Sequence, residues 1–206
     1  MTTLEHISVK DIISESLTKG ISYQDYRTLV RDLVEQGSTT GNEKTEALAN
    51  YTMLNDRRMK RWDKTIKISE EVKDKVSNFK GNMTWLVIAE SWCGDAAHVI
   101  PVLNKLSELS ENIELKLVFR DENEALMDQF LTNGGRAIAK LIMIDNTTGE
   151  VLNTFGPRPS EATQMVNDYK TEHGGLTPEF KEDLQGWYNK NKGRNIINDV
   201  IALIGL

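Results

Sequence analysis

The sequence predicts an α/β fold on three observations. A continuous apolar run over residues 85–89 is typical of a strand buried on both faces. A run that alternates between apolar and polar residues lies at 113–119, and the segment 95–109 between the two reads as a helix. Two segments that are predicted as strands, 141–144 and 151–155, are joined by the turn sequence Asp-Asn-Thr-Thr-Gly. A strand–helix–strand unit followed by a hairpin predicts a sheet of parallel and antiparallel strands with helices packed against it.

Helices are predicted on both sides of this core as well as within it. Their expected positions are 23–34, 47–62, 69–79, 122–131, 160–169, 178–189 and 195–204. The helix at 47–62 is expected to carry Tyr51, Leu54 and Trp62 on its apolar side. Ser22 and Ser160 are the expected N-caps of two of them, and Gly37 is an expected stop. The last helix carries an apolar stripe from Ile196 to Ile204, which must be buried either on the core or in a homodimer.

The chain is therefore expected to have three segments. Residues 1–82 form a helical N-terminal extension, 83–175 form the α/β core, and 176–206 form the C-terminal helices. We expect the N-terminal helices to pack on the core, because few residues separate them from the first strand. A chain of 206 residues is long enough to bury a full hydrophobic core without disulfides.

The charge balance excludes several classes of function. Asp and Glu total 31 against 25 Lys and Arg, which gives a net charge of −6. This balance disfavours nucleic-acid and anionic-membrane partners, which need a basic surface. The basic cluster at residues 57–64 is interpreted as a solvated helix face, with nucleic-acid binding as the alternative. No apolar run is long enough for a membrane span, and no signal peptide is recognised, so a cytoplasmic location is expected.

Cys93 is the only cysteine, so it cannot form a disulfide within the chain or a zinc site with other cysteines. Three scattered histidines do not suggest a metal cluster, and no nucleotide-binding motif is present, so we expect neither metal nor cofactor. Cys93 directly follows the buried strand and begins a helix, where unpaired N–H groups favour a thiolate. The alternative interpretation is a small buried apolar side chain.

The segment WCGDA at residues 92–96 resembles the WCxxC motif of the thioredoxin family. Pro101 falls where family members carry the proline that kinks the active-site helix. The chain is similar to bacterial thioredoxin-like proteins with a WCGDA motif and a helical N-terminal extension, over about residues 45–175. This resemblance implies a thioredoxin-like fold with added helices at both ends. It also implies a site in which Cys93 is supported by Trp92, Gly94, Asp95, Ala96, Pro101, Arg136, Ile138 and Ala139.

Three departures from the family pattern bear on the chemistry. Ala96 replaces the second cysteine, so no thiol of the chain can release a mixed disulfide formed on Cys93. Val87 stands where many thioredoxins have a buried acid. Ala139 stands where the family has a cis-proline facing the cysteine. Because a cis bond before a residue other than proline costs about 2.5–4 kcal/mol, we predict a trans Ile138–Ala139 peptide.

The expected function is that of a monothiol redox protein. Cys93 attacks a protein disulfide or a low-molecular-weight thiol adduct, and an external reducing thiol resolves the product. The alternative is a non-catalytic binding or scaffold protein with a thioredoxin fold, which the missing cysteine and proline favour.

Three further charged or titratable residues bear on the chemistry of the motif. The carboxylate of Asp95 opposes thiolate formation while it complements the helix dipole. Arg136 is a candidate to stabilise a thiolate or hold an anionic ligand, although a solvated arginine is the simpler interpretation. His98 follows Cys93 by five residues and is expected on the far side of the helix.

Overall fold

A four-stranded mixed sheet forms the centre of the protein in the computed structural model, which describes residues 8–206. The strands are β1 (Met83–Ala89), β2 (Ile113–Phe119), β3 (Lys140–Asp145) and β4 (Val151–Phe155). Their spatial order is β2-β1-β3-β4. β1 pairs in parallel with β2 and antiparallel with β3, and β3 and β4 form the predicted hairpin. The predicted α/β class is confirmed. The expectation that the chain does not start with a signal peptide concerns residues 1–7, which lie outside the described residues.

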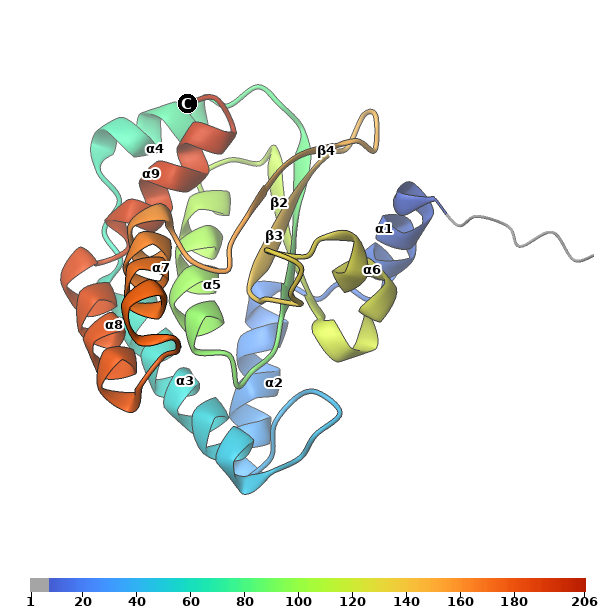
Figure 1. Ribbon diagram of the computed structural model, residues 1–206. Coiled ribbons are helices and arrows are strands. Elements are labelled where there is room, and N and C mark those ends of the chain that lie inside the picture. Colours follow the sequence, from blue (N-terminus) through green and yellow to red (C-terminus); the bar gives the residue numbers. More distant parts are fainter. Residues whose placement is uncertain (1–7) are drawn as a thin grey trace, which may run out of the picture.

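Helices cover both faces of the sheet. They are α1 (Val9–Thr18), α2 (Tyr23–Glu35), α3 (Glu46–Thr65), α4 (Glu70–Ser77), α5 (Gly94–Ser107), α6 (Glu124–Gln129), α7 (Ser160–His173), α8 (Pro178–Asn191) and α9 (Arg194–Leu203), with a short 3-10 turn at Arg120–Glu122. Figure 1 shows α5 between the sheet and the group α7, α8 and α9, with α1 and α6 on the opposite side. α3 packs against α5, and α1 packs against α6.

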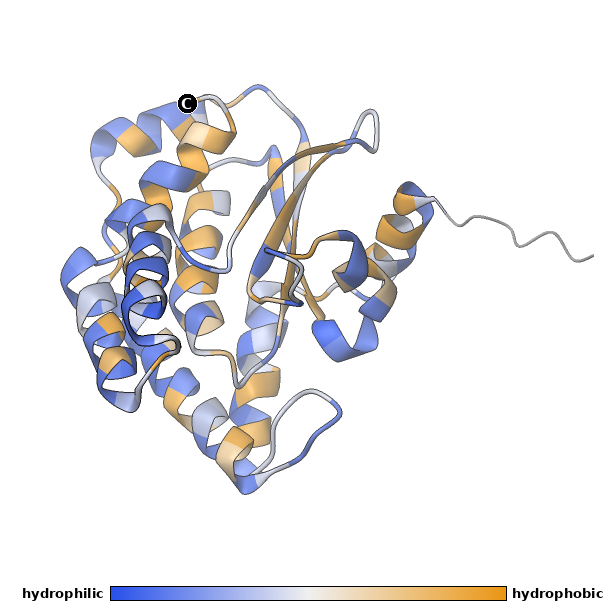
Figure 2. Ribbon diagram, viewed as in Figure 1, coloured by the Kyte–Doolittle hydropathy of each residue, from blue (hydrophilic) through white to orange (hydrophobic). Residues whose placement is uncertain are grey.

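The central strand is buried along its whole length, and the central helix is buried along most of its length. Every residue of β1 is buried, as its continuous apolar run predicted, and the strand begins at Met83. Helix α5 is buried along most of its length and accommodates Pro101. Figure 2 shows apolar residues concentrated in the sheet and α5, while α7 is mostly hydrophilic. The end of β1 and the start of α5 therefore lie in the interior, covered by the added helices.

The C-terminal stripe is buried within the chain. Ile196 and Val200 are fully buried, and α9 packs against α5, α7 and β4. The stripe therefore gives no argument for a homodimer. The predicted N-cap of α7 is wrong, because Pro159 and not Ser160 holds that position. The N–H of Ser160 is satisfied instead by Asp199 of α9, at 2.6 Å from its Oδ2.

Helix α3 differs from its predicted apolar side. Tyr51 is 49% exposed and Leu54 is 39% exposed, although periodicity placed both with Trp62. The fully buried positions instead include Thr52 and Asn55. Polar side chains face inward here because they bind the segment that leads to Cys93. Among residues 8–206, no helix is long and apolar enough to cross a membrane.

Candidate functional site around Cys93

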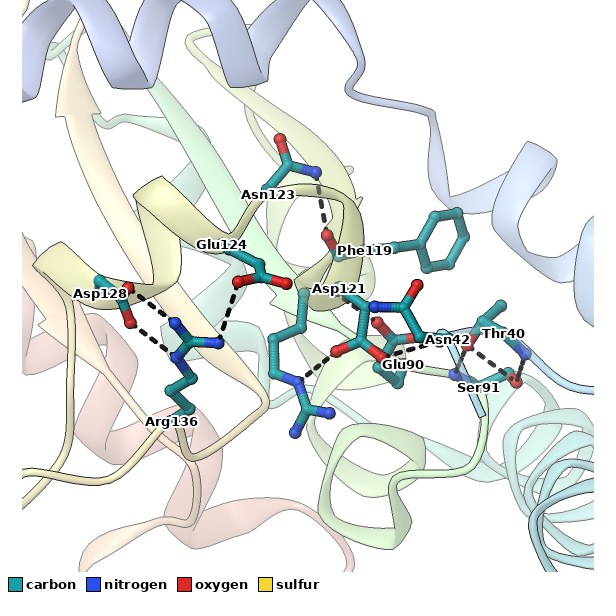
Figure 3. Close-up of polar contacts among 11 residues, drawn as sticks. Thr40, Asn42, Glu90, Ser91, Phe119, Asp121, Asn123, Glu124, Asp128 and Arg136 are labelled. Carbon is teal, nitrogen blue, oxygen red and sulfur yellow. Dashed lines mark hydrogen bonds and ion pairs between the residues drawn. The ribbon is translucent and has the colours of Figure 1, made fainter. Parts of the chain in front are cut away.

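The segment that joins β1 to α5 is held by buried hydroxyl groups of the N-terminal extension. Ser91 Oγ lies 2.8 Å from Thr52 Oγ1 and accepts the N–H of Thr40 at 3.0 Å. The N–H of Ser91 in turn donates to Thr40 Oγ1 at 2.8 Å, and Asn55 Nδ2 donates to the Ser91 carbonyl at 2.8 Å. Figure 3 shows the reciprocal contact between Thr40 and Ser91. The extension therefore fixes the backbone immediately before the cysteine.

A second group of polar residues, Asn42, Glu90 and Asp121, is shown in Figure 3. Glu90 is fully buried, and its Oε1 accepts the N–H of Asp121 at 3.0 Å. Asp121 also accepts the N–H of Asn42 at 2.9 Å and pairs with Arg120 at 2.8 Å. The guanidinium of Arg120 lies over the Trp92 ring, 5.0 Å from its centroid. Burial raises the pKa of Glu90, a residue that sequence reasoning missed because nothing in the motif marks it.

Cys93 is the N-cap residue of α5 and is 8% exposed. Its Sγ donates to the carbonyl of Ile138 at 3.2 Å. Burial, followed by the negative charge of Asp95, raises the pKa of the Cys93 thiol to about 12. The N–H groups of Ala96 and Asp95 act in the opposite direction but do not prevail. The resting side chain is therefore a neutral thiol at neutral pH, not a thiolate.

The loop that faces Cys93 contains Ile138 and Ala139, and its conformation differs from the one predicted. The Ile138–Ala139 peptide is cis, so the trans prediction is wrong. That prediction considered only the intrinsic cost of an isolated peptide bond. In the folded chain, Cys93 binds the Ile138 carbonyl, and Gly156 packs so closely that a β-carbon there would lie 2.1 Å from the Ala139 oxygen. Contacts from both sides, invisible in the local sequence, define the conformation of this loop.

Asp95 connects the start of α5 to the C-terminal part of the chain. Its Oδ2 lies 2.7 Å from Arg158 Nη2, and its Oδ1 accepts the hydroxyl of Tyr188 at 3.1 Å. Burial raises the pKa of Asp95, and Arg158 opposes that effect. Sequence reasoning did not find Arg158 or Tyr188. The only available signal for Arg158 was its place in the rigid Gly-Pro-Arg-Pro turn after the hairpin.

His98 is a structural side chain that joins three helices. Its Nδ1 accepts Trp62 Nε1–H at 2.8 Å, so its Nε2 carries the proton toward Gln185 Oε1 at 3.0 Å. Its ring stacks on Tyr188 with centroids 4.0 Å apart. Burial lowers the pKa of His98 to about 3, so the ring stays neutral. These contacts link α3, α5 and α8, and they leave neither ring nitrogen for Cys93.

Arg136 is solvent-exposed, which is the simpler of the two interpretations given by the sequence. Its guanidinium binds Asp128 at 2.6 and 2.7 Å and approaches Glu124 at 3.4 Å, on the exposed side of α6 (Figure 3). The structure does not bring it to the cysteine. The cations that do lie beside Cys93 are Arg158 and Arg58, the latter from the basic cluster of α3.

A cavity of about 420 Å³ opens beside Cys93. Its walls come from α3, the first turn of α5, the loop after β4 and α8. The lining residues are Leu48, Tyr51, Arg58, Trp92, Cys93, Gly94, Asp95, His98, Arg158, Leu176, Lys181, Leu184, Gln185 and Tyr188. Four predicted site residues, Trp92 to Asp95, thus meet at the cavity, whereas Ala96 and Pro101 lie inside α5. In the described part of the chain, no group of three or more His, Cys, Asp or Glu side chains could hold a metal ion.

The fold and this strand–cysteine–helix junction define a thioredoxin-like protein. The thioredoxin family model matches residues 41–170, and the chain belongs to this family. A crystal structure of a protein of unknown function from Pseudomonas aeruginosa has a TM-score of 0.58 at 20% identity, covering 76% of this chain and 89% of that one. An HIV epitope-scaffold has a TM-score of 0.55 at 19% identity, covering 89% and 98%. No curated protein matches the chain.

Proposed function

We propose that this protein is a monothiol thiol–disulfide exchange protein that uses Cys93. The observation that carries the proposal is the position of the sulfur. Cys93 is the N-cap residue of α5, lies near the N–H groups of Asp95 and Ala96, and lines an open cavity that can admit a second sulfur. N–H groups at a helix N-terminus stabilise negative charge that develops on the sulfur during exchange.

The exchange proceeds in two steps. The Cys93 sulfur attacks one sulfur of a disulfide, which forms a Cys93 mixed disulfide and expels the other half as a thiol that takes up the proton. An external thiol then attacks the mixed disulfide, restores the Cys93 thiol and leaves with the bound half as a new disulfide. The external thiol is required because Cys93 is the only cysteine of the chain. The cytoplasmic location expected from the sequence supplies such thiols.

The neutral resting state of Cys93 limits the rate at which its sulfur attacks a disulfide. Because the thiolate is the nucleophile, a pKa near 12 makes Cys93 slow toward general reagents at neutral pH. Reaction is therefore favoured for disulfides that the cavity holds close to the sulfur, where proximity compensates for the low thiolate fraction.

A second candidate is a binding protein without redox activity. It is favoured by the hydrogen bond from Cys93 Sγ to the Ile138 carbonyl, which keeps the thiol protonated as a structural donor. In this alternative, the cavity binds a ligand and the thiol only contributes to its wall. The two candidates differ in whether Cys93 ever forms a covalent adduct.

Mass spectrometry of the intact protein separates the two. The protein is incubated with bis(2-hydroxyethyl) disulfide, weighed, and weighed again after an external thiol is added. The monothiol function predicts one adduct that is absent in Cys93→Ser and is removed by the added thiol. Persistence of the unmodified mass, with adduct formation only after unfolding in urea, supports the binding protein and excludes the exchange function.

A further inference from the structure

The cavity beside Cys93 has an excess of positive charge. Its charged lining residues are Arg58, Arg158, Lys181 and Asp95, which sum to two net positive charges. The chain as a whole has a net charge of −6, so this local sign is opposite to that of the protein. The positive end of α5, a helix of 14 residues, also points into this region and adds to the attraction for anions.

Arg58 is the cation best placed to receive a ligand. Its Nη1 donates to Asn55 Oδ1 at 2.9 Å, which orients the guanidinium. A β-carbon at Gly94 would lie 3.5 Å from the same Nη1, so the group stands over the first turn of α5, next to Cys93. Across residues 8–206, no carboxylate lies within 4.0 Å of Arg58 to form an ion pair, unlike the paired Arg158.

Arg158 and Lys181 reinforce this arrangement. The Nη2 atom of Arg158 forms an ion pair with Asp95, while its Nε is buried and has no hydrogen-bond partner in the described residues. Lys181 stands at the exposed edge of the cavity on α8. A guanidinium presents a planar fork that matches a carboxylate, so Arg58 is suited to that group in particular.

The remaining walls are apolar and fit a small molecule. They are formed by Leu48 and Tyr51 of α3, Leu176 and Leu184 near α8, and the indole of Trp92. A volume of about 420 Å³ lies within the range of small-molecule pockets. Because α3 and α8 flank the cysteine, a compact ligand enters this cavity more easily than the disulfide of a folded protein.

We propose that the cavity binds the disulfide of a small thiol that bears a carboxylate, and that Arg58 binds this carboxylate. The inference rests on the proposed monothiol function and names its substrate class. The ligand's apolar carbons lie against the Trp92 and Leu184 walls, and its carboxylate on Arg58 brings a ligand sulfur toward Cys93. The Cys93 sulfur then bonds to the near sulfur while the S–S bond of the ligand breaks, and the distal half departs as a thiol that takes up the proton from Cys93.

Three small disulfides of similar size and different charge test the binding step. They are 3,3′-dithiodipropionate, bis(2-hydroxyethyl) disulfide and cystamine, which are anionic, neutral and cationic. Their affinities are measured by calorimetry on the full-length Cys93→Ser protein, which cannot exchange. We expect the anion to bind at least tenfold more tightly than the neutral compound. Adding Arg58→Gln removes this preference, whereas adding Arg57→Gln, a neighbouring exposed arginine, retains it.

The outcomes separate this inference from the function on which it rests. Equal affinities of Cys93→Ser for the anion and the neutral compound, or no binding of either, overturn the carboxylate site. A preference that survives Arg58→Gln also overturns the role of Arg58. Adduct formation by the wild type then reports separately on exchange. A clear anion preference without any adduct keeps the carboxylate site and refutes the monothiol function.

Discussion

Asp95 Oδ2 lies 2.7 Å from Arg158 Nη2. Asp95 follows Cys93 by two residues in the chain. This ion pair joins the first turn of α5 to the loop after β4 and closes one side of the cavity. It also determines the electrostatic environment of the thiol. Asp95 raises the pKa of Cys93, while Arg158 lowers it. The two charges act on the same sulfur with opposite sign, so each can be tested by substitution.

The first prediction concerns the reactivity of Cys93. Asp95→Asn removes a like charge and leaves Arg158 without its partner, so the pKa of Cys93 falls and alkylation by iodoacetamide accelerates. Each pKa unit increases the thiolate tenfold but lowers its intrinsic nucleophilicity by about threefold, so the net gain is about threefold per unit. The rate at pH 7.5 is compared with that of Asp128→Asn, whose carboxylate pairs with exposed Arg136. An unchanged or slower rate in Asp95→Asn would show that the charge of Asp95 does not raise the pKa of Cys93.

The second prediction concerns the stability of the same pair. Arg158→Gln leaves Asp95 without its cation. The Asp95 side chain is mostly buried, with 13% of it exposed, so its unpaired charge destabilises the fold. Breaking a fully buried pair costs about 3–5 kcal/mol, and partial exposure of Arg158 reduces this to about 2 kcal/mol. Urea unfolding measures the loss. Arg136→Gln, which breaks an exposed pair, is the matched control and is expected to change the midpoint little.

The third prediction concerns the hydroxyl cluster behind Cys93. Ser91→Ala leaves the N–H of Thr40 without its acceptor and removes one of the two hydroxyl contacts of Thr52, which keeps its contact with Thr39. A buried polar group that loses its hydrogen bond costs about 1–3 kcal/mol, and we expect a loss of unfolding free energy in that range. Ser77→Ala removes an exposed hydroxyl as the control. Equal stability of the two variants would show that the cluster does not hold the segment before Cys93.

The fourth prediction concerns pH and His98. Burial lowers its pKa to about 3 in the folded protein, below the value of about 6.5 in the unfolded chain. The stabilising contribution is therefore complete above pH 6.5 and is lost progressively as the pH falls toward 3, by about 1.4 kcal/mol per unit.

His98→Gln isolates this contribution. Glutamine can still accept from Trp62 and donate to Gln185, but it does not titrate. We expect the stability difference between wild type and variant to shrink by about 2 kcal/mol between pH 7 and pH 5 in urea unfolding. Raised carboxyl pKa values at Glu90 and Asp95 have the opposite sign but are common to both proteins. A difference that is independent of pH would mean that His98 titrates normally.

The core and the position of Cys93 were predictable because they depend on local patterns. A five-residue apolar run predicts a buried strand, and WCGDA places a cysteine where a strand gives way to a helix. The remaining features depend on partners distant in sequence. Asp95 meets Arg158 and Tyr188 only after the C-terminal helices fold back, and the cis Ile138–Ala139 peptide sits between Cys93 and Gly156.

The buried polar face of α3 shows another limit of sequence patterns. Hydropathy periodicity assigns Thr52 and Asn55 to the solvent side, because it cannot recognise a polar residue whose partner is a buried backbone. Both residues bind Ser91, so they are buried while Tyr51 is exposed. Arg58 was likewise placed in a solvated basic cluster, although its half-buried guanidinium lies beside Cys93.

The central claim is that Cys93 exchanges disulfides with the help of an external thiol. The most direct measurement is the rate at which the protein accelerates reduction of 3,3′-dithiodipropionate by a small external thiol, with Cys93→Ser as the reference. We expect the rate to increase in proportion to the concentration of wild-type protein and to equal the uncatalysed rate with Cys93→Ser. A wild-type rate no greater than that of Cys93→Ser would show that Cys93 does not exchange disulfides.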